Sequence, residues 1–214
     1  SSGGDFIIGR LYRYITLLLG FKPNEHEYKL MGMAPYSKEI YFKNLLKRFE
    51  KMQDVKKLKF KFINKPKDMY FSIKKIIDGN RFDVVCGALQ KYTENLILKW
   101  VKNCVSKTRY NNICLAGGVA MNVKANLELS KLKKINNVYV QPSPDDSSQA
   151  MGACYAYCVL NNKPVYKIEN AYLGYEIKDD PLKFINKKEL KNYKLYINNI
   201  NKIAAKYLKD GKIL

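Results

Sequence analysis

The sequence is short of the residues that build many metal and disulfide sites. It contains one histidine, His26, and five cysteines, none of them in a Cys-x-x-Cys pair. A single histidine with no neighbouring ligand is typical of a surface residue rather than of a metal centre. Scattered cysteines indicate reduced thiols in a cytoplasmic protein rather than a disulfide framework. Cys154 and Cys158 lie one helical turn apart, and we expect both to be small core residues.

Long apolar runs, internal repeats and low-complexity linkers are also absent from the sequence. No segment is long and apolar enough to cross a bilayer, and we recognise no secretory signal, so we expect a cytoplasmic protein without a membrane partner. The 214 residues suit one domain of ordinary size, or one and a fraction. The small polar residues 1–5 begin so abruptly that we expect the chain to be cut from a longer one.

Acidic residues are few, since 19 Asp and Glu stand against 39 Lys and Arg, for a net charge of +20. Such a balance is typical of nucleic-acid-binding proteins, because cations that neutralise phosphates supply most of the non-specific affinity. The basic residues are, however, mostly lysines scattered over what we expect to be solvated faces, and Asn, Ile and Tyr are abundant as well. This pattern favours a compositional bias of the whole chain, so we do not predict a nucleic-acid partner from charge alone.

What the chain does contain is a pair of consecutive strand-turn-helix units within residues 111–153. In the first unit the apolar run 113–116 predicts a buried strand, and Gly117 and Gly118 predict a turn. Apolar residues then recur at the spacing of a helix: Val119, Val123 and Leu127. Without a Cβ, the two glycines can take positive φ and bring their backbone against a ligand, toward which the helix would point its free N–H groups.

The second unit repeats this plan. Residues 138–140 predict a strand, prolines follow it, and residues 145–147 open a helix. Ligands bind beyond the carboxyl ends of the strands in open α/β sheets, where we expect the two loops to meet. Four residues could therefore share one site: Gly117, Gly118, Asn122 and Asp146. The plainer interpretation is turn chemistry and helix capping alone, and the spacing by itself does not decide between the two.

Periodicity predicts the remaining elements. Apolar residues at helical spacing predict four helices, over residues 8–19, 27–33, 39–53 and 82–104. Ile40 is expected to face inward in the third helix, and Trp100 to belong to the core in the fourth. Strict alternation over 58–62 predicts a half-exposed edge strand protected by lysines, and a short helical signal covers 200–208.

Glu27 and Lys29 lie in the second of these helices. A lysine held near a nucleotide would supply a point charge for phosphate oxygens. From the residues alone, the two are better explained as an ordinary solvated surface pair.

Three segments together resemble a known family: Glu-Tyr-Lys-Leu-Met-Gly-Met-Ala-Pro-Tyr at 27–36, Leu-Ala-Gly-Gly-Val-Ala-Met-Asn at 115–122, and Gln-Pro-Ser-Pro-Asp-Asp-Ser-Ser-Gln-Ala-Met-Gly-Ala at 141–153. In order and spacing they are similar to the nodulation and antibiotic O-carbamoyltransferases. Further matches extend the resemblance over most of residues 6–175: Gly9–Tyr12, Leu19–Pro23, Gln90–Glu94 and Tyr172–Tyr175.

The resemblance implies an α/β fold, the second half of an ATPase domain of the actin and sugar-kinase type, with a mixed sheet flanked by helices. It also implies an enzyme that transfers a carbamoyl group from carbamoyl phosphate to a hydroxyl of a small-molecule acceptor, by way of ATP and a carbamoyl-adenylate. Residues 1–175 would form the partial ATPase-like domain. Residues 176–214 would form a linker and the truncated start of a C-terminal catalytic domain.

By the same resemblance, six residues bind the nucleotide or carbamoyl-adenylate: Glu27, Lys29, Gly117, Gly118, Val119 and Asn122. Asp146 matches the aspartate that ligates a divalent metal, iron or magnesium, and a carboxylate suits such a cation when it bridges phosphate oxygens. The family's other metal ligands are a His-x-x-x-His pair, which this chain with its single histidine lacks. Asp145 and Ser148 stand where the family commonly has glycine, and they either add a carboxylate or cap the helix. We therefore expect the segment to be inactive without the N-terminal half and the C-terminal domain.

Two other functions stay open. The tRNA threonylcarbamoyl-transferring enzymes share the fold and a similar glycine loop, and the basic charge favours them, whereas segment 27–36 favours the small-molecule enzymes. The other alternative is a non-catalytic remnant that binds a nucleotide or a partner protein. The sequence does not identify the acceptor, the metal or the oligomeric state.

Overall fold

The chain divides into two compact units, residues 1–167 and 168–214. The computed structural model describes residues 5–166 and 198–213, together with residues 168, 170, 172, 174–176, 178, 183 and 191. In the second unit, the amphipathic helix α9 (Ile200–Lys209) confirms the helical signal at its expected place. Leu173, in the segment Tyr172–Tyr175, lies outside the described residues. Within the described ranges, no helix is long and apolar enough to cross a membrane.

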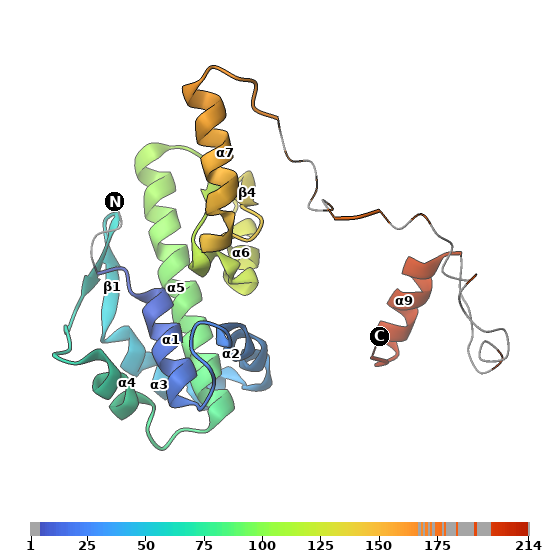
Figure 1. Cartoon of the computed structure of the whole chain (residues 1–214). Helices are drawn as coiled ribbons and strands as arrows, with labels where there is room; N and C mark the ends of the chain where they lie inside the picture. Colours follow the sequence, from blue (N-terminus) through green and yellow to red (C-terminus); the bar gives the residue numbers. More distant parts are fainter. Residues whose placement is uncertain are drawn as a thin grey trace. The chain divides into compact units, whose positions relative to one another are not determined.

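Helix α5 (Phe82–Thr108) is the long central element of the first unit (Figure 1). Every residue from Val84 to Gln90 is buried, so this part of the helix has no solvated face. A helix that is buried on all sides is stable only when other elements cover each of its faces. It ends at Arg109, whose φ of 62° is the left-handed conformation that commonly stops a helix. The helix predicted over residues 82–104 is confirmed and continues to Thr108.

The N-terminal helices cover one part of α5. These elements are α1 (Ile8–Leu18), α2 (Glu27–Met33), the 3-10 helix η1 (Ala34–Tyr36), α3 (Glu39–Glu50) and α4 (Met69–Ile77). α2, η1 and α3 pack directly against α5, and α4 packs against α1 and α3. Ile40, expected to face inward, is 79% exposed. It lies two residues before the buried Phe42, which places it about 200° around the helix axis and therefore on the opposite face.

A two-stranded hairpin covers another face of α5. Strands β1 (Gln53–Lys56) and β2 (Lys59–Phe62) pair antiparallel, with Val55 opposite Phe60. Both of these side chains are buried, whereas Lys59 and Lys61 are exposed. The alternating strand expected over 58–62 is therefore confirmed.

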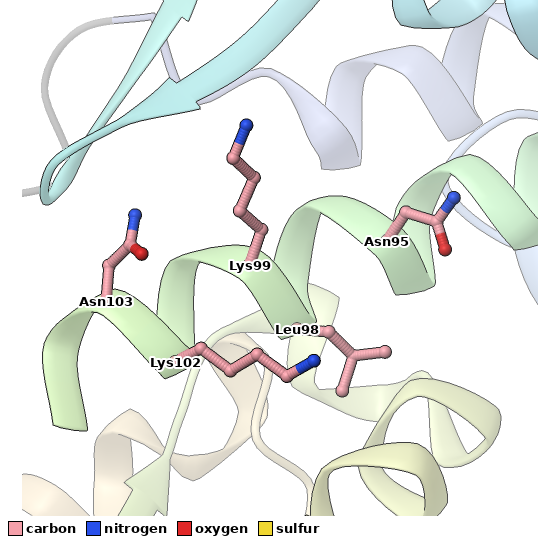
Figure 2. Close-up of a pocket in the computed structure, with 5 residues that line it drawn as sticks. All are labelled: Asn95, Leu98, Lys99, Lys102 and Asn103. Carbon is pink, nitrogen blue, oxygen red and sulfur yellow. The ribbon is translucent and has the colours of Figure 1, made fainter. Parts of the chain in front are cut away.

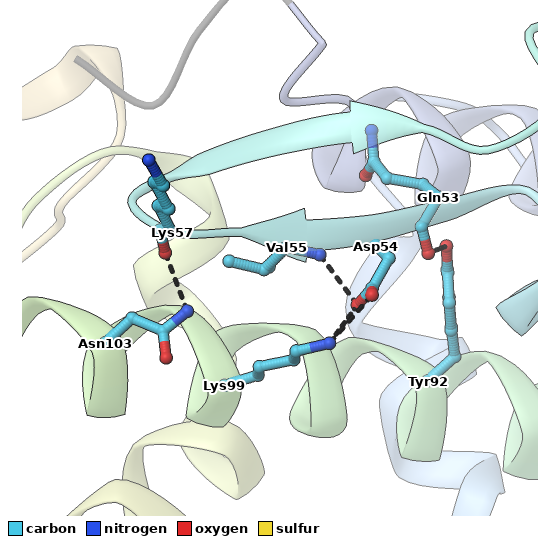
Figure 3. Close-up of polar contacts among 7 residues, drawn as sticks. All are labelled: Gln53, Asp54, Val55, Lys57, Tyr92, Lys99 and Asn103. Atoms are coloured by element: carbon cyan, nitrogen blue, oxygen red, sulfur yellow. Dashed lines mark hydrogen bonds and ion pairs between the residues drawn. The ribbon is translucent and has the colours of Figure 1, made fainter.

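Polar contacts join this hairpin to α5 (Figure 3). Side chains along α5 bond to the hairpin: Tyr92 donates to the Gln53 carbonyl at 3.1 Å, Lys99 to the Asp54 carboxylate at 2.6 Å, and Asn103 to the Lys57 carbonyl at 2.6 Å. Trp100 donates its indole N–H to the Leu58 carbonyl at 3.0 Å, and its ring centroid lies 5.4 Å from that of Phe60. Trp100 therefore packs against the core, as predicted.

A parallel strand pair lies on the other side of α5 from the hairpin (Figure 1). β3 (Asn112–Leu115) and β4 (Asn137–Val140) pair with Asn112 opposite Asn137. The 3-10 helix η2 (Gly118–Met121) and α6 (Val123–Ser130) follow β3, and η3 (Asp146–Ser148) and α7 (Gln149–Leu160) follow β4. The two predicted strand-turn-helix units are confirmed. The described residues thus form a mixed α/β structure with two small sheets.

The predicted apolar face of α6 is wrong. Val123 and Leu127 are 60% and 47% exposed, whereas Ala125 and Leu129 are buried. The expected face assumed one continuous helix after the glycine turn, but η2 has fewer residues per turn and a break precedes α6. The helical register therefore restarts at Val123.

Burial around β3 and α7 also differs from expectation. β3 is half-exposed along its length rather than buried. Cys154 is exposed and Cys158 is only partly buried, so neither is the core residue that their spacing suggested. The spacing correctly indicates an apolar helix, but burial depends on what packs against it. Among the described residues, α7 is covered on too few sides to bury any side chain.

Gly87 lies at the contact between α5 and α3. A Cβ at this position would lie 2.6 Å from Cδ1 of Phe42 and 3.2 Å from Cβ of Ser37. We predict that Gly87→Ala lowers the free energy of unfolding by about 1–2 kcal/mol, because overpacking outweighs the helix propensity that alanine adds. Chemical denaturation measures this change.

The matched control is Gly32→Ala in α2, where a Cβ would meet no atom within 4 Å. We expect this variant to keep its stability or to gain up to about 1 kcal/mol from helix propensity. A Gly87→Ala protein that is more stable than the parent would contradict the packing described.

The pair Asp54–Lys99 makes part of the stability pH-dependent. Burial alone would raise the pKa of Asp54, but the hydrogen bonds from Lys99 and the Val55 amide outweigh it and hold that pKa below its usual value. Because the pKa of Asp54 is lower in the folded than in the unfolded chain, the ion pair makes its full contribution to the free energy of unfolding above about pH 4. This contribution is lost as the pH falls through the folded pKa.

We predict that Asp54→Asn lowers the free energy of unfolding by about 0.5–1 kcal/mol at pH 7 and by progressively less at acid pH. The effect is small because both partners are partly exposed, Lys99 by 49% and Asp54 by 35%. Urea denaturation at several pH values measures it. Lys99→Met should remove the same pH dependence, and the double variant should lose little more than either single variant. If the free energies of unfolding of the parent and of Asp54→Asn differ by the same amount down to pH values well below 4, the result would argue against the ion pair.

Candidate functional site

The loops that follow β3 and β4 meet at one edge of the parallel sheet. Because the strands run in parallel, their carboxyl ends lie on the same side. The Gln141 amide donates to the Leu115 carbonyl at 3.1 Å, and the Gly117 amide donates to the Pro144 carbonyl. The second bond joins the glycine turn directly to the loop that carries Asp146. The structure therefore brings the two predicted loops together at the edge where open α/β sheets bind ligands.

Gly117 and Gly118 form an exposed turn. Gly117 has a φ of +94°, a conformation that a side chain would strain, whereas Gly118 has no such φ. A Cβ at either position would meet no atom within 4 Å. The backbone of the turn thus borders open space. The side chain of Val119 instead lies against α1, where its Cγ2 is 3.5 Å from the position that a Cβ on Gly9 would occupy.

Asn122 is buried at the end of this turn, with 9% of its surface exposed. It is the N-cap of α6, and its Oδ1 accepts from the Ala125 amide at 3.0 Å and from Gln90 Nε2 at 3.0 Å. Its Nδ2 donates to Gln90 Oε1 at 3.0 Å and to Tyr12 Oη at 3.2 Å. The two donor and two acceptor positions of the amide are therefore all used within the protein. A ligand could contact the Asn122 side chain only by replacing one of these bonds.

The partners of Asn122 were not predicted. Tyr12 and Gln90 lie 110 and 32 residues away from it in the sequence, so no local spacing connects them. One signal was present. Gln90 is a polar amide at the end of the apolar run 84–89, where a buried helix would otherwise continue with apolar residues.

Asp145 and Asp146 differ in their contacts. The Asp145 carboxylate accepts from the Ser147 amide at 3.0 Å, and hydrogen bonds from Ser147 lower the pKa of Asp145. Ser148 donates its hydroxyl to the Asp145 carbonyl at 3.1 Å. Asp146 is exposed, and its Oδ1 accepts from Gln149 Nε2 at 3.1 Å. Asp145 and Ser148 therefore cap the start of the helical segment, while the carboxylate of Asp146 faces solvent.

A metal ion fits this edge only in part. Asp146 offers one oxygen ligand, but nowhere in the described ranges do three or more His, Cys, Asp or Glu side chains gather to hold a metal. His26 lies elsewhere, on the loop before α2, where its Nδ1 accepts from the Lys22 amide at 3.2 Å. The described part of the chain therefore does not supply a complete set of ligands to a cation at this edge.

Glu27 and Lys29 lie on α2, which packs against α1, η1 and α5 rather than on the parallel sheet. Glu27 Oε1 accepts from the Asn24 amide at 2.7 Å, so it fixes the loop that leads into the helix. The Lys29 ammonium lies 5.6 Å from the centroid of the Phe21 ring and 5.9 Å from that of Tyr28. Aromatic faces attract such a cation and hold it near one position.

Two hollows lie near these elements. One, of about 320 Å³, lies between the parallel sheet and α7 and is lined by Cys114, Leu115, Ala116, Tyr139, Gln141, Ser148, Gly152 and Tyr155. It includes the carboxyl ends of both strands, so it adjoins the edge where the two loops meet.

The other hollow, of about 270 Å³, lies along α5 (Figure 2). Figure 2 shows Lys99 and Asn103 directed toward the hairpin and Lys102 directed away from it. Lys99 is already bonded to Asp54, and Asn103 to the Lys57 carbonyl. All the residues that line this hollow belong to α5, and two of its four polar side chains, those of Lys99 and Asn103, are already bonded to the hairpin.

A model of the carbamoyltransferase N-terminus matches residues 4–155 of the chain. The chain belongs to the carbamoyltransferase family. The match includes the glycine turn, Asn122 and Asp146, which confirms the family that the three sequence segments resemble.

Individual relatives of this carbamoyltransferase-family chain are longer than it is. An uncharacterised protein of Methanocaldococcus jannaschii is 30% identical over 220 residues, which cover 97% of the chain and 41% of the relative. An uncharacterised protein of Synechocystis is 29% identical over 187 residues, or 78% of the chain and 30% of the relative. The nodulation protein NolO of Bradyrhizobium diazoefficiens is 28% identical over 131 residues, or 59% of the chain and 24% of the relative. The chain thus spans 24% to 41% of the length of these relatives.

The two glycines of the turn should respond differently to the same substitution. We predict that Gly117→Ala lowers the free energy of unfolding by about 1–2 kcal/mol, because a side chain at this φ is strained. Gly118→Ala serves as the matched control and should change the stability by less than about 0.5 kcal/mol, because its φ is ordinary and its surroundings are open. Thermal or urea denaturation of both variants makes the comparison. Equal losses would show that the conformation of Gly117 is not the distinguishing feature.

Proposed function

We propose that the chain is part of an ATP-dependent O-carbamoyltransferase, which uses carbamoyl phosphate by way of a carbamoyl-adenylate to carbamoylate a hydroxyl of a small-molecule acceptor. Membership of the carbamoyltransferase family supports the transferred group. The whole activity would belong to a longer protein, because relatives of 30% and 29% identity extend well beyond the length of this chain.

The bond between Gly117 and Pro144 is the observation that carries the proposal. It holds the glycine turn and the Asp146 loop at one edge, where the exposed backbone of the turn lies beside an exposed carboxylate. Backbone amides suit phosphate oxygens, and a carboxylate suits a cation that accompanies them. A nucleoside triphosphate with its bound cation would bring both the phosphate oxygens and the positive charge to this edge.

The residues of this edge take distinct roles in the proposal. The first N–H groups of a helical turn have no partner within it, so we assign the amides of Gly118 and Val119 to the phosphate oxygens. Asn122 shapes the turn from beneath rather than contacting the ligand, since its amide is fully bonded. Lys29, with Glu27 on the same helix, is assigned to the nucleotide as a point charge, as the resemblance implies.

Asp146 is assigned to a divalent cation, iron or magnesium, as one oxygen ligand. When bound, such a cation would neutralise negative charge on the phosphate oxygens. Because no complete ligand set lies within the described residues, the remaining ligands would come from the nucleotide and from other parts of the enzyme. Transfer to the acceptor hydroxyl is likewise assigned to another part of the enzyme, so the chain should be inactive by itself.

The net charge of +20 favours a second candidate, an RNA-modifying relative that transfers a threonylcarbamoyl group to tRNA. The matched family model and the nodulation relative favour the small-molecule carbamoyltransferases instead. Charge spread over a whole chain is weaker support than a match over residues 4–155, so we retain the first candidate.

We predict that the intact enzyme releases pyrophosphate from ATP only when carbamoyl phosphate is present. Asp146→Ala should lower this rate about a hundredfold, the scale on which loss of one charge-stabilising group acts. Gly118→Val should abolish ATP binding without unfolding the protein, because its side chain would occupy the open space beside the turn. Pyrophosphate release and isothermal titration with ATP measure the two effects.

The control for Asp146→Ala is Asp78→Ala, which removes another exposed carboxylate, just after α4, and should leave the rate unchanged. Normal pyrophosphate release by Asp146→Ala would remove Asp146 from the mechanism. ATP consumption that does not depend on carbamoyl phosphate would contradict the proposed function as a whole.

A further inference from the structure

A buried polar cluster lies beneath the glycine turn, among the apolar side chains that fill the core. Its members are Tyr12 of α1, Gln90 and Glu94 of α5, and Asn122, the N-cap of α6. All four residues are buried, with 8%, 4%, 9% and 9% of their surface exposed, respectively. Buried polar groups are costly unless they are hydrogen-bonded, so such a cluster is retained only when its members satisfy one another.

Gln90 is at the centre of this cluster. Its Oε1 accepts from Tyr12 Oη at 2.6 Å and from Asn122 Nδ2 at 3.0 Å. Its Nε2 donates to Glu94 Oε1 at 2.9 Å and to Asn122 Oδ1 at 3.0 Å. Gln90 and Asn122 thus form a reciprocal amide pair, and every hydrogen-bonding position of the Gln90 amide is filled.

The cluster has a direction. Because Glu94 Oε1 accepts a hydrogen bond from Gln90, the NH₂ group of the Gln90 side chain points toward Glu94, one turn further along α5. The Gln90 side-chain oxygen is then free to accept from Tyr12. Burial raises the pKa of the Tyr12 phenol above its usual range, so this hydroxyl keeps the proton that it donates. Together these contacts select the one orientation of the Asn122 amide in which Oδ1 receives the Ala125 amide.

The orientation of Asn122 reaches the glycine turn through the backbone. The backbone N–H of Asn122 donates to the Val119 carbonyl at 3.1 Å, so Asn122 closes the C-terminal end of η2. At the other end, the backbone N–H of Ala120 donates to the Gly117 carbonyl at 2.8 Å. Fixing Asn122 therefore fixes the turn whose exposed amides we assign to the phosphates. A binding turn held in place before its ligand arrives loses less entropy on binding.

We propose that Gln90 is a positioning residue for the nucleotide site: it holds Asn122, with the help of Tyr12 and Glu94, and through Asn122 it sets the geometry of the Gly117–Met121 turn. This inference rests on the proposed function, because it concerns the same site. The plainer alternative is that the cluster only stabilises the packing of α1, α5 and α6.

The test is steady-state kinetics of carbamoyl-phosphate-dependent pyrophosphate release by the intact enzyme and its Gln90→Leu variant. A positioning role predicts that the KM for ATP rises about tenfold, the usual cost of losing a group that orients a binding residue, while the KM for carbamoyl phosphate changes less than twofold. A purely structural role would reduce the amount of active enzyme, and hence the apparent kcat, and would leave the KM for ATP unchanged.

The matched control is Gln53→Leu, which makes the same substitution at another buried glutamine, one that is 2% exposed and donates to the Asp5 carbonyl. It should lower the Tm and leave the KM for ATP as it is. Tyr12→Phe is the second test variant, since it removes one bond, keeps the ring and so remains folded if Gln90→Leu does not. We expect it to raise the KM for ATP about twofold to fivefold, less than Gln90→Leu, because Gln90 retains its other partners.

The outcomes separate the two proposals. If the parent enzyme releases pyrophosphate only with carbamoyl phosphate, and the KM for ATP is unchanged in Gln90→Leu and in Tyr12→Phe, the proposed function stands and the positioning role is overturned. If Gln90→Leu does not fold, an unchanged KM in Tyr12→Phe alone overturns it. A parent enzyme without carbamoyl-phosphate-dependent activity overturns the proposed function, and with it this inference.

Discussion

The burial of the first part of α5 on every side is the constraint on which the first unit depends. Residues 84–90 have no solvated face, so different elements must cover each side of the helix. α3 can approach closely because Gly87 leaves room for the ring of Phe42. The hairpin covers another face and is joined to α5 by polar contacts along its length. With α2 and α6 in contact as well, the helix organises the whole unit.

Gln90 connects the buried part of α5 to the candidate site, because its side chain bonds to Asn122 beneath the glycine turn. A buried amide at this position would cost stability if it lacked partners, yet Tyr12, Glu94 and Asn122 use all of its bonding positions. The result is that the core and the glycine turn depend on one another. The residues that pack the helices also hold the N-cap beneath the turn, so the stability of the unit and the geometry of its loop share the same contacts.

The parallel strand pair contrasts with this well-covered region. Parallel sheets usually have both faces covered, whereas the side chains of β3 and β4 are exposed or only partly buried. α7 is apolar and still has no buried residue. Two relatives of this chain are longer than it is, since the chain spans 41% of the M. jannaschii protein and 30% of the Synechocystis protein. The hollow beside Cys114 and Tyr155 is part of this lightly covered region.

The sequence by itself determined the order and type of the main elements: the long α5, the alternating strand β2, and two strand-turn-helix units with a glycine that needs positive φ. These depend on periodicity and local turn chemistry, which act over a few residues. Only the tertiary structure decided that Asn122 turns into the core, that Ile40 and Cys154 are exposed, and how α1, α5 and α6 share one cluster. Those outcomes depend on contacts between residues 32 to 110 positions apart, or on which neighbours cover a helix, and no local pattern records either.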